Sequence, residues 1–381
     1  MAVFRESVPR DLPGKLMELN WSLVLLLVLI GAAGVGMLYS VGDGSWEPWA
    51  VQHAIRFAVG FVAMLVIAMF PPRFWMGVAY PVYTVALILL IGAELFGATV
   101  NGSQRWLDIG PIRLQPSELM KIALVFALAR FYHDLPTERV SRLGGLLVPA
   151  ALIGVPAMLI LKQPDLGTTL LLVATGGAVV FLAGLSWKVI LPGAVAGLAA
   201  GIGFFSYGLE DYQRQRIMTM FNPDSDPLGA GYQILQSKIA LGSGGFTGKG
   251  FMEGTQSQLD YLPEKQTDFI FTILGEEFGF VGGLVILTVY ALILANTVAI
   301  ATSCKSTFLR LTTMGVATTF GLYVFINVGM VMGVLPVVGV PLPMISYGGT
   351  VMLAVLAGFG LILGAHIHRN AEPPRGVGLF G

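Results

Sequence analysis

"SLVLLLVLIGAAGVGMLYS", residues 22–40, is a long run in which no side chain is charged. An α-helix rises about 1.5 Å per residue, so about 20 apolar residues cross the roughly 30 Å hydrocarbon core of a bilayer. The run therefore predicts a membrane-spanning helix. Its length and the many similar runs that follow distinguish it from a cleavable signal peptide.

Nine further apolar runs could each span a membrane. They lie at about 52–70, 74–97, 116–133, 147–161, 167–184, 187–206, 267–298, 307–335 and 346–367. The pattern predicts an all-α polytopic membrane protein with about ten transmembrane helices in a single integral membrane domain, residues 1–381. A large external loop, about 207–266, would separate spans seven and eight. Within it, the apolar and polar residues of 230–245 suit an amphipathic helix at the membrane interface.

The composition supports the same class. The chain is 55% hydrophobic and 12% charged, with a mean hydropathy of +0.78, whereas about 25% of the residues of a soluble domain are charged. The 22 basic residues balance the 22 acidic ones, which argues against a polyanionic partner such as nucleic acid. The one cysteine and the four scattered histidines exclude an internal disulfide framework and a zinc-type site.

The orientation follows from the basic residues, which are enriched in short cytoplasmic loops. An internal N-terminus places eleven of the 22 on the cytoplasmic side: Arg5, Arg10, Lys15, Arg73, Arg139, Arg142, Lys188, Lys305, Arg310, Arg369 and Arg375. The short loops on the opposite side hold only Arg105, Arg113 and Lys162. The sequence therefore predicts that both termini are cytoplasmic and that the loop at 207–266 is external.

Ionisable groups at membrane depth are costly and usually functional. The segment "RLQPSELMK", residues 113–121, contains Arg113, Gln115, Glu118 and Lys121 at the start of a predicted span. Glu118 and Lys121 are three residues apart, so they share a helix face and can pair. One interpretation is a structural ion pair; the other is that Lys121 binds a phosphate-bearing headgroup and Glu118 positions it.

The second such segment is "LPEKQTDFIFTILGEEFGF", residues 262–280. Thr267 could cap the predicted helix at 267–298, with Asp268 in its first turn. Asp268 is then either a helix-capping residue or a general base for a sugar hydroxyl at an external cavity. Glu276 lies about 12 Å further along a helix axis, and Glu277 nearly opposite Asp268. We therefore expect these two glutamates to be structural.

Two further features belong to the external side. Arg56, Arg105, Arg214 and Arg216 are each suited to a solvated surface, but as a set they would suit phosphate oxygens. The segment "GVPLPMISYGGT", residues 339–350, predicts either a re-entrant loop that lines a cavity or a simple turn.

These motifs together resemble the SEDS family (shape, elongation, division and sporulation proteins), and its elongation-associated branch most closely. The resemblance covers nearly the whole chain and is carried by "NGSQRWLDIGPIRLQPSELMKIA" (101–123), "QPDLGTTL" (163–170), the residues 214–282 and "NVGMVMGVLPVVGVPLPMISYGGT" (327–350). It implies a ten-span inner-membrane glycosyltransferase that polymerises lipid II into peptidoglycan strands, with a class B penicillin-binding protein of the rod complex as its partner.

The resemblance also implies roles for particular residues. The family's essential aspartate follows Pro-Glu-x-x-Thr and maps to Asp268. The important glutamate and lysine of its Gln-Pro-Ser-Glu helix map to Glu118 and Lys121, and the preceding arginine and glutamine map to Arg113 and Gln115.

The hypothesis that follows is an inverting transfer. Asp268 would deprotonate the acceptor's 4-hydroxyl, and Lys121 and Arg113, assisted by Arg56 and Arg105, would hold the undecaprenyl diphosphate leaving group. No cofactor is evident, although a divalent cation (Mg or Mn) could assist. The alternatives are a lipid II flippase, which should carry polar groups along the whole depth of a path, and a non-catalytic scaffold, which would not need a buried Glu118 and Lys121.

Overall fold

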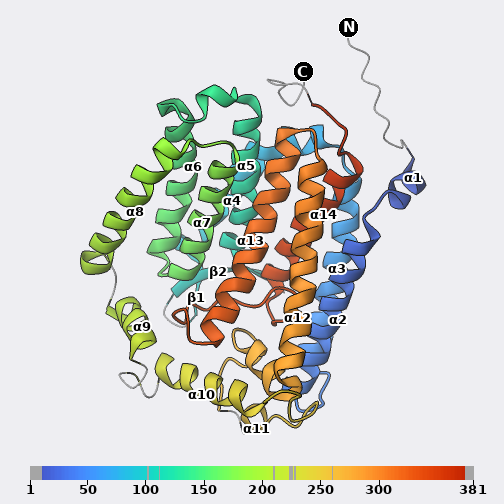
Figure 1. Cartoon of the computed structure of the whole chain (residues 1–381), viewed down its shortest axis with the longest axis vertical. Helices are drawn as coiled ribbons and strands as arrows, with labels where there is room; N and C mark the ends of the chain where they lie inside the picture. Colours follow the sequence, from blue (N-terminus) through green and yellow to red (C-terminus); the bar gives the residue numbers. More distant parts are fainter. Residues whose placement is uncertain are drawn as a thin grey trace.

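The computed structural model describes residues 11–100, 103–110, 112–208, 211–222, 226, 229–259 and 261–373. Its long helices stand side by side in one bundle, and the short helices α9, α10 and α11 gather at one end of it (Figure 1). The short helix α1 (Leu12–Met17) and the end of α14 lie at the opposite end. This arrangement agrees with the prediction that the N- and C-terminal parts lie on one side and the large loop on the other.

A helix occurs at each of the ten predicted spans. These helices are α2 (Trp21–Val41), α3 (Trp49–Met69), α4 (Pro72–Phe96), α5 (Pro116–Asp134), α6 (Leu143–Lys162), α7 (Leu166–Leu182), α8 (Trp187–Tyr207), α12 (Ile270–Ser303), α13 (Thr307–Val331) and α14 (Gly349–Ile367). Among the described residues, seven of them are long and apolar enough to cross a membrane: α2, α3, α4, α6, α12, α13 and α14. The chain is thus a multi-pass membrane protein, and the count of ten stays a prediction.

The starts of several helices follow from local chemistry. The side chain of Asn20 accepts a hydrogen bond from the Leu23 amide at 3.0 Å and caps α2, as Asp165 does for α7 through the Thr168 amide. Pro72 and Pro116 occupy the first positions of α4 and α5, where the missing N–H of proline costs no helical hydrogen bond.

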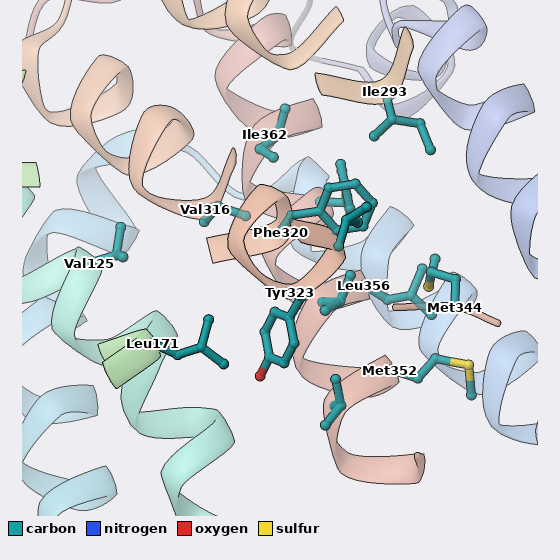
Figure 2. Packing of buried hydrophobic residues seen from close by; sticks show 14 of the residues in the cluster. Val125, Leu171, Ile293, Val316, Phe320, Tyr323, Met344, Met352, Leu356 and Ile362 are labelled. Carbon is teal, nitrogen blue, oxygen red and sulfur yellow. The ribbon is translucent and has the colours of Figure 1, made fainter. Parts of the chain in front are cut away.

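The centre of the bundle is formed by α5, α13 and α14. Most residues of α5 are buried, and 83% of the apolar stretch of α14 is buried. Figure 2 shows side chains of α5, α7, α12, α13 and α14 converging here, among them Val125, Leu171, Ile293, Val316 and Leu356. Because α5 faces protein rather than lipid, it can carry the charged residues that make its start the least hydrophobic of the predicted spans.

The interval before α5 differs from the all-α prediction. It forms a three-stranded antiparallel sheet of β1 (Ala98–Val100), β2 (Ser103–Ile109) and β3 (Ile112–Leu114), in the order β1-β2-β3. Gly110, with φ of +63°, lies in the reversal between β2 and β3, a conformation that glycine adopts without steric cost. The pairing sets Asp108 opposite Arg113. The all-α prediction did not include these strands.

The segment predicted to be external (207–266, hereafter the external segment) contains α9 (Asp211–Phe221), α10 (Ala230–Ser243) and α11 (Thr255–Gln258). The helix predicted within 230–245 is therefore confirmed as α10; its position at a membrane interface stays a prediction. Ser237 of α10 hydrogen-bonds to Thr272 and to the Val331 carbonyl, each at 2.8 Å. The external segment is thereby fastened to α12 and α13.

The predicted continuous helix at 267–298 is wrong, because α12 is interrupted at Gly279 (φ 64°, ψ −161°). A Cβ placed on Gly283 would lie 3.6 Å from Cζ of Phe271, whereas twelve residues of straight helix would span about 18 Å. The residues before Gly279 therefore fold back against those after it. The loop after α10 fills the break: the Phe280 amide donates to the Gly245 carbonyl, and the Gly250 amide to the Glu277 carbonyl, each at 3.0 Å.

The segment between α13 and α14 is irregular and buried. Val340, Leu342, Met344 and Ile345 are all at most 2% exposed. Polar side chains from neighbouring helices satisfy its carbonyls: His53 of α3 contacts the Met344 oxygen at 3.1 Å, and Tyr290 of α12 donates to the Pro343 oxygen. Non-helical backbone that is enclosed in protein matches the re-entrant interpretation of 339–350 rather than a simple surface turn.

Candidate active site

Asp268 lies just before α12, and hydrogen bonds to main-chain carbonyls hold it there. Helix α12 begins at Ile270 without a side-chain cap, and the Thr267 hydroxyl bonds to Glu264 at 2.8 Å instead of capping the helix. Asn327 of α13 donates to the Asp268 carbonyl at 2.8 Å, and Ser346 donates to the Thr267 carbonyl. The expectations of a Thr267 cap and of Asp268 in the first helical turn are therefore wrong, because this stretch forms turns, with the Thr267 and Phe269 amides donating to the Glu264 carbonyl, and partners from α13 and the re-entrant segment bind it.

The carboxyl group of Asp268 is poised between its two protonation states. Loss of solvation raises the pKa of Asp268 to about 7; Glu264 and Asp165 act in the same direction, and Arg216 acts against them. The side chain is partly exposed, and within the described part of the chain its carboxylate makes no hydrogen bond. A Cβ on Gly339 would lie 3.4 Å from Oδ2 of Asp268, so the glycine leaves room beside the carboxylate. Such a group can accept a proton near neutral pH.

A small polar cleft lies beside Asp268. It has a volume of about 20 Å³ and lies between β2, the start of α7, α9 and the residues that follow α13; its lining includes Arg105, Asp165, Gln213, Arg216 and Val338. Arg105 donates to the Gln163 carbonyl at 3.0 Å and lies 3.6 Å from Asp165. Val338, in the wall of the cleft, directly precedes Gly339, which contacts Asp268.

Glu118 and Lys121 form the predicted ion pair, at 2.8 Å. They are 4% and 1% exposed. Tyr323 of α13 completes the group: its hydroxyl bonds to both the Glu118 carboxylate and the Lys121 ammonium. Figure 2 shows the Tyr323 hydroxyl pointing away from Phe320 and Leu356. Because Lys121 is enclosed and fully paired, this geometry favours the structural ion pair over direct contact with a headgroup.

Arg56, Arg113 and Gln115 converge on the start of α14. The Arg56 guanidinium lies 4.7 Å from the centre of the Tyr347 ring. A Cβ on Gly349 would lie 3.2 Å from Arg56 Nε. The Thr350 hydroxyl bonds to the Arg113 carbonyl at 3.2 Å and accepts from the Gln115 amide at 3.4 Å.

The start of α14 is also hydrogen-bonded to the segment that carries Asp268. The Tyr347 amide donates to the Gln266 carbonyl at 2.9 Å, two residues before Asp268. The Arg113 side chain is exposed and bonds to Asp108 across the sheet at 3.0 Å. The start of α14 therefore links the predicted cations Arg56 and Arg113 to the segment that carries Asp268.

The family is decided by sequence comparison. The model of the FtsW/RodA/SpoVE family of cell cycle proteins matches residues 15–371. The chain belongs to this family. It is 48% identical over 317 residues to the peptidoglycan glycosyltransferase MrdB of Escherichia coli K12, covering 83% of this chain and 85% of MrdB. It is 34% identical to the stage V sporulation protein E of Bacillus subtilis, covering 90% and 95% of the two chains.

Solved structures of family members share the fold. A chain of a peptidoglycan synthase complex that coordinates polymerisation and crosslinking superposes with a TM-score of 0.80 at 34% identity, covering 92% of this chain and 98% of that one. The rod shape determining protein RodA of Thermus thermophilus superposes with a TM-score of 0.70 at 30% identity, covering 93% and 98%. The likeness to this family, stated from the motifs, is thereby confirmed.

Glu276 and Glu277 are bound within this SEDS fold by partners other than Asp268. Glu276 is fully buried and pairs with Lys249 at 2.6 Å, and it accepts from Thr255 and from the Gln256 amide. The Glu277 carboxylate accepts from Ser40 of α2. These contacts fasten the external segment to α12 and α12 to α2, which is consistent with the structural interpretation of the two glutamates.

Sequence reasoning missed Tyr323, Asn327 and Tyr347 as members of this SEDS site. Tyr323 and Asn327 are four residues apart on α13, so they share one helix face, and polar side chains on one face of an apolar span were a usable signal. Their partners lie elsewhere in the sequence, however, so the spacing alone could not assign those contacts.

The described part of the chain shows no ready-made cluster of metal-binding side chains. The described residues contain no group of three or more histidine, cysteine, aspartate or glutamate side chains that could hold a metal ion. No residue of the SEDS site is therefore assigned to the divalent cation that the sequence left open.

Proposed function

We propose that the chain is a peptidoglycan glycosyltransferase that polymerises lipid II into β-1,4-linked glycan strands at the outer face of the inner membrane during cell elongation. The observation that carries the proposal is the Asp268 carboxylate, which has no hydrogen-bond partner among the described residues and a pKa of about 7, beside a cleft that contains Arg105 and Arg216. The family supports it, since a relative at 48% identity is a peptidoglycan glycosyltransferase.

In the proposed reaction, Asp268 takes the proton of the 4-hydroxyl of the acceptor's N-acetylglucosamine. The oxygen attacks C1 of the donor's N-acetylmuramic acid from the face opposite the diphosphate. The new C1–O bond forms as the bond to the diphosphate breaks, so the α-linked donor yields a β-linkage. The proton remains on Asp268 until it passes to solvent.

The leaving undecaprenyl diphosphate carries the negative charge of the broken bond. We assign its stabilisation to Arg56, Arg105 and Arg113, because guanidinium groups bind phosphate oxygens with two parallel hydrogen bonds. Gln115 belongs to the same region through its backbone contact with Thr350. Glu118 and Lys121 act indirectly, by anchoring the start of α5 to α13 through Tyr323.

The proposed topology has ten transmembrane helices, cytoplasmic termini and the large external loop at about 207–266. It is supported by the coincidence of every predicted span with a helix and by the position of α9, α10 and α11 at the end of the bundle opposite α1 (Figure 1). The proposed partner is a class B penicillin-binding protein of the rod complex, since a similar chain is part of a peptidoglycan synthase complex.

The experiment is reconstitution of the purified protein and its penicillin-binding partner with labelled lipid II. Under the proposal, long glycan strands accumulate and a muramidase digests them. A protein that makes no polymer but moves fluorescent lipid II across proteoliposomes would instead be a flippase, the other function that the intramembrane charges suit. If the protein neither makes polymer nor transports lipid II, the result would indicate the non-catalytic scaffold.

A further inference from the structure

Helix α9 covers the cleft beside Asp268 although it belongs to the external segment and not to the bundle. It packs against α10, and Figure 1 shows it at the edge of the molecule, below α8. The side of α9 that faces the cleft carries Gln213, Arg216 and Ile217. These residues are spaced i, i+3 and i+4, so they form one helix face. Arg214 is not on this face.

The charges that face Asp268 come from three different elements. Glu264 lies in the turn before it, Asp165 at the start of α7 and Arg216 on α9. Arg105 lies next to Asp165, at 3.6 Å, so the charge of Asp165 is already partly balanced. Arg216 is the cation that opposes the two carboxylates at Asp268. The bundle contributes Asp165 to this set, and the external segment contributes both Glu264 and Arg216.

We propose that α9 is part of the catalytic site and that Arg216 is a positioning residue that places a positive charge in the cleft beside Asp268. The inference rests on the proposed function, in which Asp268 is the general base. The charge of Arg216 favours the carboxylate form of Asp268, the form that can take the proton of the acceptor hydroxyl. Without this charge, Glu264, Asp165 and the loss of solvation favour the protonated acid, which cannot take a proton.

The experiment is the pH dependence of lipid II polymerisation by the reconstituted complex for a charge series at this position: wild type, Arg216→Lys, Arg216→Gln and Arg216→Glu. The acid limb of kcat/KM should move to higher pH in the order lysine, glutamine, glutamate. A shift of one pKa unit lowers the rate roughly tenfold at a pH below the limb. For a shift of about that size, Arg216→Gln should therefore lose about tenfold near pH 6, one unit below the limb, and recover in alkaline buffer. Arg214→Gln removes the same charge from another face of α9 and should leave the profile unchanged.

A second measurement separates this inference from the proposed function. The infrared band of the protonated Asp268 carboxyl, identified by its loss in Asp268→Asn, reports the titration of this group whether or not the protein polymerises lipid II. Its midpoint should rise in Arg216→Gln and not in Arg214→Gln. Equal midpoints in wild type and Arg216→Gln, or a loss of rate that is the same at every pH, would overturn the role of Arg216. If the wild-type complex makes no polymer but the midpoint of the Asp268 titration still rises in Arg216→Gln, the result would contradict the proposed function and not the electrostatic effect of Arg216.

Discussion

At the scale of single residues, the position of Asp268 is set by hydrogen bonds to the main chain and not by hydrogen bonds of its side chain. Its main chain and that of Thr267 are bound by Asn327 and Ser346, which leaves the carboxylate without a hydrogen-bond partner in the described structure. A carboxylate that accepted several hydrogen bonds would be a weaker base. The sequence could place an aspartate at the start of a span, but the partners that hold it come from α13 and the re-entrant segment, about 60 and 80 residues further along the chain.

The pH dependence of the reaction follows from this environment. The pKa of Asp268 is raised to about 7, and a general base acts in its ionised form. Activity should therefore be low in acid, rise through a pH of about 7 and level off above it, as a pH profile of kcat/KM for lipid II polymerisation would show. An acid limb near 4, the ordinary value for aspartate, would contradict the buried environment.

Lys121 should be needed for stability. Lys121→Met leaves the Glu118 charge buried without its partner, and breaking a buried pair in this way costs about 3–5 kcal/mol. Thermal unfolding in detergent should show a marked loss of stability. The double variant Glu118→Gln with Lys121→Met removes both charges and should recover part of it; a double variant no more stable than Lys121→Met would contradict the pairing.

At the scale of elements, the helices could be predicted and their interruptions could not. Apolar length sets the ten helices to within a few residues, because a span needs about 20 apolar residues whatever its neighbours are. The break in α12 depends on the loop at 244–250, which supplies hydrogen bonds to residues 276–281. An apolar pattern carries no information on that contact, so the sequence predicted one helix from 267 to 298.

Gly279 should be required for this break. It adopts a φ of 64°, and an added Cβ would lie 2.3 Å from the Gly248 amide nitrogen. Gly279→Ala should lower the free energy of unfolding by about 1–3 kcal/mol. Gly177 of α7 is a matched control, since a Cβ there meets nothing within 4 Å and alanine favours a helix. Equal melting temperatures for the two variants would show that the break does not depend on glycine.

At the scale of the whole molecule, the side of the membrane on which each end lies can be tested with introduced cysteines. The chain's one cysteine, Cys304, is buried and can be replaced by serine. In that background, Asp43→Cys should react with an impermeant maleimide in intact spheroplasts, whereas Arg142→Cys should react only after lysis. Both positions are exposed in the fold. The reverse pattern would invert the proposed topology.

The central claim is that Asp268 is the base of lipid II polymerisation, and the most direct test is the rate of polymer formation by the complex with its penicillin-binding partner. General base catalysis contributes about 10²- to 10⁴-fold, so Asp268→Asn should lose at least about a hundredfold at unchanged protein yield. Asp43→Asn, the same substitution at an exposed carboxylate whose φ of 53° asparagine tolerates, should polymerise lipid II at the wild-type rate. Polymer from Asp268→Asn at that rate would contradict the account.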